Sequence, residues 1–98
     1  MPVPYKVKVT VDSVTKGKCP QGFGEGDSWL IADGKTPGGM CAGAYNSVGP
    51  AIRTLRLGGE HPWNENKDVT YVSCPDPEHC VIYEVEAVRL SSLIIWQV

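Results

Sequence analysis

The stretch YKVKVTVD, from Tyr5 to Asp12, decides the fold class of this chain. Its apolar residues alternate with polar ones, which is the period of a β-strand that buries one face. The same period recurs from Val81 to Ala87, and short apolar runs at Ser28–Ala32 and Val69–Ser73 predict two more strands. The last apolar run, Leu93–Val98, predicts either a fifth strand or a tail.

Helix is predicted between the second and third of these strands, in two pieces. The first piece runs from Met40 to Val48. Pro50 cannot continue a helix without a kink, but it is well placed as the first residue of a second piece, which Gly58-Gly59 ends. Strands grouped around a Pro-interrupted helix pair predict an α+β fold with a small, mostly antiparallel sheet. A partly closed barrel is the alternative arrangement of these strands.

Size and charge limit the function. The 98 residues suit one domain, 1–98, and nine basic against eleven acidic residues leave no positive excess for nucleic acid. The longest apolar run, Leu93–Trp96, is too short to span a membrane. The N-terminus lacks the layout of a signal peptide, so we expect a cytoplasmic protein with reduced thiols. Because so small a core is marginal, a metal, a second copy of the chain or a larger enzyme is expected to support it.

The four cysteines are the most informative residues, since each lies at the end of a predicted element. A zinc ion or an iron–sulfur cluster would take Cys19, Cys41 and Cys74, with Cys80 or alternatively His79 as the fourth ligand. The chain has no CxxC pair, so the spacing of a zinc ribbon is missing.

Three other interpretations of the cysteines stay open. Cys74 and Cys80 bracket the turn CPDPEHC and would form a disulfide in an oxidising setting. Cys41 would be the nucleophile of a thiol-dependent enzyme, because the start of a helix stabilises a thiolate. The third interpretation is a structural or interaction subunit whose cysteines are buried and inert.

A few other residues carry weaker signals. His61 lies in a polar loop and is expected to be solvated, while Trp63 beside it is a candidate for lining a ligand pocket. Asp27 and Asp76 have the sequence context of turn formers, with a general base as the alternative for Asp27.

The chain also resembles a known family. The motifs are CPQG at 19–22, GD at 26–27, TPGGMCAGA at 36–44, GG at 58–59, PW at 62–63 and CPDP at 74–77. In this order they resemble an uncharacterised family of short, single-domain prokaryotic proteins, many of them from anaerobes, with no established activity. The resemblance implies that Cys19, Cys41 and Cys74 are the shared thiols, whereas Cys80 and the segment Leu93–Val98 lie outside the pattern. The leading hypothesis is therefore a small cytoplasmic accessory protein that binds a metal or a cluster.

Overall fold

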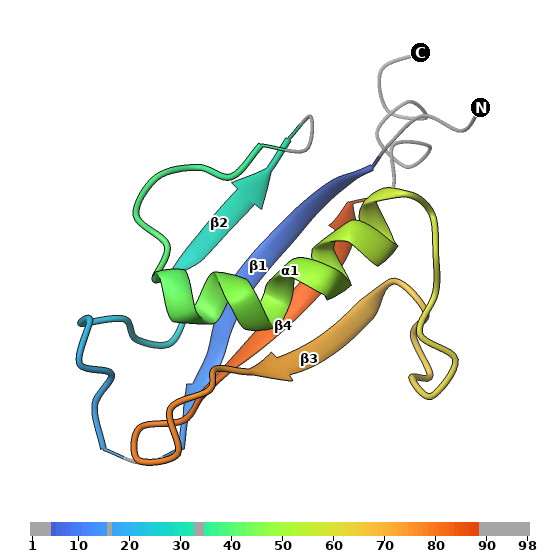
Figure 1. Ribbon diagram of the computed structural model, residues 1–98. Helices are drawn as coiled ribbons and strands as arrows, with labels where there is room; N and C mark the ends of the chain where they lie inside the picture. Colours follow the sequence, from blue (N-terminus) through green and yellow to red (C-terminus); the bar gives the residue numbers. More distant parts are fainter. Residues whose placement is uncertain (1–4, 16, 33–34, 89–98) are drawn as a thin grey trace.

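A four-stranded antiparallel sheet and one helix make up the fold (Figure 1). The computed structural model describes residues 5–15, 17–32 and 35–88. The elements are β1 (Lys6–Val14), β2 (Ser28–Ile31), α1 (Ala42–Arg56), β3 (Val69–Ser73) and β4 (Val81–Val88). The strand order is β2-β1-β4-β3, and each neighbouring pair is antiparallel. This confirms the predicted α+β class, while the predicted element at Leu93–Val98 lies outside the described residues.

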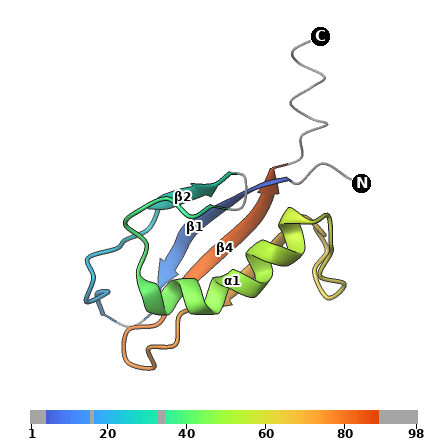
Figure 2. The ribbon, with the colours of Figure 1, turned by 45° about the horizontal axis from the view of Figure 1, so that its top comes forward.

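The sheet is open, so the variant of a partly closed barrel is wrong. The edge strands β2 and β3 are only four and five residues long, and they stand at opposite ends of the strand order. Closure would need hydrogen bonds between these two edges across a tilted and staggered sheet. Instead, α1 crosses one face of the sheet and connects one edge to the other (Figure 2).

The core lies between α1 and the inner face of β1 and β4. In the register of these central strands, Val9 pairs with Val85 and Val11 pairs with Tyr83, and all four side chains are buried. The helix contributes buried residues at helical spacing, namely Ala44, Val48, Ala51, Ile52 and Leu55. The alternation of β1 and β4 therefore has the predicted effect of burying one face of the sheet.

The predicted helix pair is wrong, because α1 is one continuous helix of 15 residues with Pro50 inside it. A proline usually forces the residue before it out of the helical conformation by contacts with its Cβ. That residue is Gly49, which has no Cβ, and the ring of Pro50 faces solvent. The Thr54 hydroxyl donates a hydrogen bond of 3.0 Å to the Pro50 carbonyl. The buried face continues across the proline, so packing against the sheet keeps the helix intact.

Replacing Pro50 with Ala is expected to stabilise the fold by about 1–2 kcal/mol. Proline costs about 3 kcal/mol relative to alanine inside a helix, and part of this is offset because proline also stiffens the unfolded chain. Urea unfolding of the Pro50→Ala variant measures the difference. An unchanged or lower free energy of unfolding would show that the proline fits this helix without cost.

Helix α1 ends as predicted at Gly58-Gly59. Gly58 has a φ of +85°, which a side chain would strain, and its amide donates to the Leu55 carbonyl at 3.1 Å. The Gly59 amide donates to the Thr54 carbonyl at 2.8 Å. These two bonds form the Schellman pattern that satisfies the last carbonyls of a helix.

A β-bulge at Asp12 changes the direction in which β1 ends. Val11 pairs with Tyr83 and Ser13 pairs with Ile82, so Asp12 is the extra residue. Beyond it Val14 pairs with Val81 and packs against the core, although a regular alternation would turn it away. The bulge therefore keeps the last residue of β1 in contact with the core.

No helix in residues 5–15, 17–32 or 35–88 combines the length and the apolar character needed to cross a membrane.

Candidate functional site

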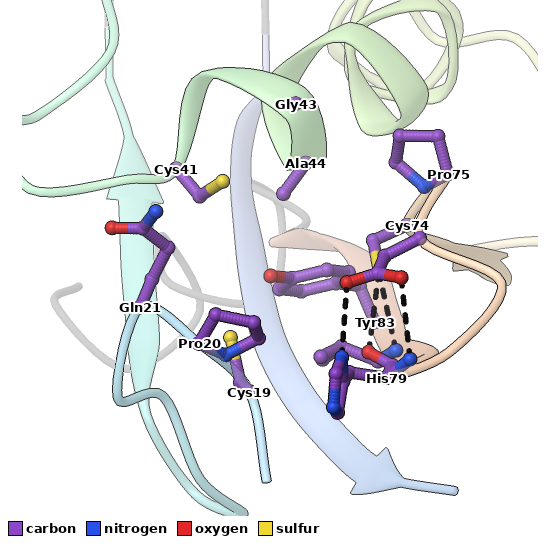
Figure 3. A pocket seen from close by; sticks show the side chains of 12 residues that line it. Cys19, Pro20, Gln21, Cys41, Gly43, Ala44, Cys74, Pro75, His79 and Tyr83 are labelled. Carbon is purple, nitrogen blue, oxygen red and sulfur yellow. Dashed lines mark hydrogen bonds and ion pairs between the residues drawn. The ribbon is translucent and has the colours of Figure 1, made fainter. Parts of the chain in front are cut away.

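Three of the four cysteines line one cavity. Cys19 comes from the loop after β1, Cys41 from the residue before α1, and Cys74 from the residue after β3. The cavity has a volume of about 150 Å³. Figure 3 shows the three cysteines arranged around the ring of Tyr83, which forms part of its floor. The fold thus brings together thiols that are far apart in the sequence.

Cys41 is the N-cap of α1, as its predicted position at the helix start implies. Its backbone is extended, with a ψ of 132°, and its carbonyl accepts the Tyr45 amide at 2.9 Å. Its side chain makes no capping hydrogen bond, so the first amides of the helix stay uncapped. A Cβ on Gly43 would lie 3.9 Å from the Cys41 Sγ and 3.8 Å from the Pro75 Cγ. The start of α1 and the turn after Cys74 therefore form two close walls of the cavity.

Cys74 is fixed by the first residue of β4. Its amide donates to the Val81 carbonyl at 2.9 Å, and its Sγ accepts the Val81 amide at 3.3 Å. A weaker contact of 3.8 Å joins the Cys74 Sγ to the His79 carbonyl. These contacts fix the position of the Cys74 Sγ at the wall of the cavity.

Asp76 shapes the turn between Cys74 and Cys80, as predicted. One of its oxygens accepts the amides of Glu78 at 2.9 Å and His79 at 3.3 Å, and the other lies 3.4 Å from the His79 ring nitrogen Nδ1. The Glu78 amide first, and then His79, hold the pKa of the Asp76 carboxyl below its usual range. The carboxylate is thus directed to its own turn, and His79 is placed on the wall of the cavity.

Tyr83 is the residue of the site that sequence analysis missed. Its side chain is 1% exposed, and its hydroxyl points toward the space between Cys19 and Cys41 (Figure 3). Burial, together with the nearby charges of the Cys19, Cys74 and Cys41 thiolates, raises the pKa of Tyr83 to about 12. The phenol therefore keeps its proton in neutral solution.

The fourth cysteine is not part of this cavity. Cys80 serves the fold through its carbonyl, which accepts both the amide and the hydroxyl of Thr15 at 2.8 and 3.0 Å. Cys74 and Cys80 are both free thiols, so the disulfide predicted as one alternative is not formed in this structure. Of the two predicted fourth ligands, His79 lines the cavity and Cys80 does not.

A single metal ion does not fit the side chains as they are placed. Around one tetrahedral zinc ion the sulfurs would lie about 3.8 Å apart, because each Zn–S bond is about 2.3 Å long. Among the described residues no three His, Cys, Asp or Glu side chains are grouped closely enough to share an ion. A cluster needs less convergence, because each cysteine binds a different iron atom.

The remaining candidates lie elsewhere. His61 is buried rather than solvated, at 9% exposed, because the ring of Trp63 packs edge-on against it at 5.1 Å. Trp63 itself is 74% exposed, and neither residue lines the cysteine cavity. Asp27 is a turn former, since its carboxylate accepts the Gly24 amide at 2.9 Å.

Comparison of the chain with protein-family models, with curated proteins and with solved structures finds no match to any of them. The function must therefore be argued from the cavity itself.

Proposed function

We propose that this protein is a small metal-binding accessory protein, in which the Cys19, Cys41 and Cys74 thiolates hold one metal centre in the cavity. The observation that carries the proposal is that three cysteines from three separate segments line one space. An inert core needs no such convergence, and a lone nucleophile needs only one thiol. These three cysteines are also the ones that the resemblance to the uncharacterised prokaryotic family implies as shared.

An iron–sulfur cluster is the better candidate for this centre than a single zinc ion. The spacing of the side chains argues against a single ion, because no described trio of His, Cys, Asp or Glu is grouped to share one. The amide that donates to the Cys74 Sγ is typical of cluster sites, in which hydrogen bonds to sulfur tune the reduction potential. His79 is the proposed fourth ligand, because it shares the cavity wall.

The proposal also implies a cellular compartment and a kind of partner for the protein. Three free thiols around one cavity require a compartment that keeps them reduced, so we place the protein in the cytoplasm. A chain of 98 residues suits an accessory or binding subunit, which would act as a homo-oligomer or beside a larger enzyme.

Metal analysis of protein purified without air tests the proposal. Iron, acid-labile sulfide and zinc are measured in the wild type and in the variants Cys19→Ser, Cys41→Ser and Cys74→Ser. Cys80→Ser is the matched control, because its thiol lies outside the cavity. We expect the wild type and the control to carry the centre and the other three variants to lose it. Wild-type protein that is fully folded and free of metal would refute the proposal.

A second candidate function rests on the uncapped start of α1. Here the Cys41 Sγ lies beside amides that no side chain caps, and such amides stabilise a thiolate. Cys41 would then be the nucleophile of a thiol-dependent enzyme. Alkylation of the metal-free protein, followed by mass spectrometry, should modify Cys41 before the other three cysteines. Equal and slow modification of all four would exclude this function.

A further inference from the structure

Another cavity lies between α1 and the β2 edge of the sheet. The helix packs against β1, β3 and β4, and in Figure 1 it lies over the centre of the sheet with β2 to one side. The cavity on that side has a volume of about 200 Å³. Its walls come from one stripe of α1, from the end of β2 and from the segment that follows β2. None of its described lining residues lines the cysteine cavity, so the two sites are separate.

Two arginines give this cavity a positive wall. Arg53 and Arg56 lie three residues apart in the last turn of α1, so their side chains leave the helix on the same side. None of the described lining residues is acidic, and within residues 5–15, 17–32 and 35–88 neither guanidinium forms an ion pair. Basic residues at this end of a helix compensate its dipole, which accounts for their charge but not for the cavity beside them.

The Arg56 side chain has an unsatisfied donor where it stands. Its Nε is buried and has no hydrogen-bond partner. Buried polar groups in proteins are almost always paired, and an unpaired donor of a charged group is especially costly. The Arg56 carbonyl accepts the Tyr5 amide at 2.8 Å, so the backbone is held and only the side chain is free to turn. A turn of the guanidinium toward the cavity would pair the Nε with an oxygen atom of a ligand.

We propose that this cavity binds a small ligand with an oxyanion group at one end and an apolar part at the other. The Arg53 and Arg56 guanidiniums hold the oxyanion, because the planar fork of arginine matches two oxygen atoms of a carboxylate or a phosphate. The apolar part packs against Ile31 and Ile52, which are buried side chains of the same wall. The volume is sufficient, since a cavity of about 150 Å³ holds a benzene ring.

This site goes beyond the proposed metal centre, because neither arginine is one of the proposed metal ligands. The two proposals can fail separately. The test is therefore made on the full chain, reduced and treated with a chelator, in which a metal centre can neither supply nor block the effect.

The probes are benzoate and phenyl phosphate, each titrated into ¹⁵N-labelled protein at constant ionic strength with chloride as the balancing ion. We expect the Nε–H resonances of Arg53 and Arg56 to shift and to saturate, and the tighter probe tells a carboxylate site from a phosphate site. Benzyl alcohol has the same ring without the charge and should bind at least about tenfold more weakly. Shifts that saturate with neither probe, that chloride reproduces, or that benzyl alcohol matches in affinity would overturn the inference.

Variants of the two arginines assign the donors. Arg56→Gln and Arg53→Gln are each expected to weaken binding of the tighter probe by about tenfold or more. The Arg53 side chain is exposed, so its variant leaves the core intact. Lys8→Gln is the matched control, since it removes the same charge from an exposed position of β1, on the face of the sheet opposite to the core. Unchanged binding in both arginine variants, or an equal loss in the control, would overturn the assignment.

Arg56→Lys separates the charge of this side chain from its shape. Lysine keeps the positive charge but lacks the planar fork that pairs with two oxygen atoms. We expect an affinity between those of the wild type and of Arg56→Gln. Wild-type affinity in Arg56→Lys would refute the paired contact with the oxyanion.

Discussion

Stripping the proposed metal centre with a chelator is expected to lower the free energy of unfolding by about 4 kcal/mol, for a metal or cluster present at a thousand times its dissociation constant. The reason is that the centre binds only the folded chain. Its three proposed ligands lie after β1, before α1 and after β3, and unfolding separates them. Urea unfolding of the loaded and stripped protein, both without air, gives the difference.

The cysteine variants show whether the cavity is the source of this stability. Cys19→Ser, Cys41→Ser and Cys74→Ser should each lose the difference between loaded and stripped protein, whatever their own effect on the stripped state. Cys80→Ser should keep the full difference, because its thiol does not line the cavity. The proposal fails if the chelator leaves the wild type unchanged, or if Cys80→Ser behaves like the other three variants.

Alkaline solution is expected to destabilise the metal-free fold by about 2–3 kcal/mol through Tyr83 alone. Its pKa is about 12 in the folded protein, against 10.0 for the ordinary side chain. Below pH 10 both states hold the proton and the stability is fully present. Between pH 10 and 12 the unfolded chain releases the proton while the folded chain keeps it, so the free energy of unfolding falls as the pH rises.

Urea unfolding at a series of pH values, on wild type and on Tyr83→Phe, measures this loss. The variant keeps the ring in the core and has no proton to release, so its stability should fall less steeply across this pH range. Tyr71→Phe is the comparison: the hydrogen bond to Glu84 also raises the pKa of Tyr71, but this side chain is 54% exposed, so its loss should change the slope less than the loss of the Tyr83 hydroxyl does. Identical slopes in Tyr83→Phe and the wild type would show that the Tyr83 phenol ionises as easily in the fold as in the open chain.

The sheet could be predicted from the sequence because burial of one strand face repeats every second residue. This held for β1 and β4, whose alternating residues pair across the centre of the sheet. Closure of the sheet could not be predicted, since alternation says which face of a strand is buried and nothing about which edges meet. That depends on the path of α1 from β2 to β3.

The helix pair was predicted from a local rule that the packing of α1 overrides. Pro50 lowers the helical preference of its own segment, but the buried face of α1 continues through Ala51 and Ile52. Gly49 removes the contact that normally ends a helix before proline. Local preference is a weak guide where a helix face is held by the core.

The candidate site was predictable only in part. Position at element ends selected all four cysteines; Cys19, Cys41 and Cys74 do line one cavity, but Cys80 does not, and the set of three came from the family resemblance. Tyr83 could not be selected, because its pattern in β4 is that of any buried strand residue. Whether a buried strand residue contacts the core or lines a cavity depends on which element packs over it. For Tyr83 this element is the start of α1.

The bulge at Asp12 has a consequence for the evolution of this cavity. The extra residue reverses the alternation of β1, so that the strand residues after it face the opposite side of the sheet from the one a regular strand would give them. Val14 packs against the core as a result, and Cys19 follows five residues later in the chain. The inward position of Val14 therefore depends on one extra residue in β1. Deleting Asp12 is expected to turn Val14 away from the core and to change where the segment that leads to Cys19 begins, with every cysteine still in the sequence.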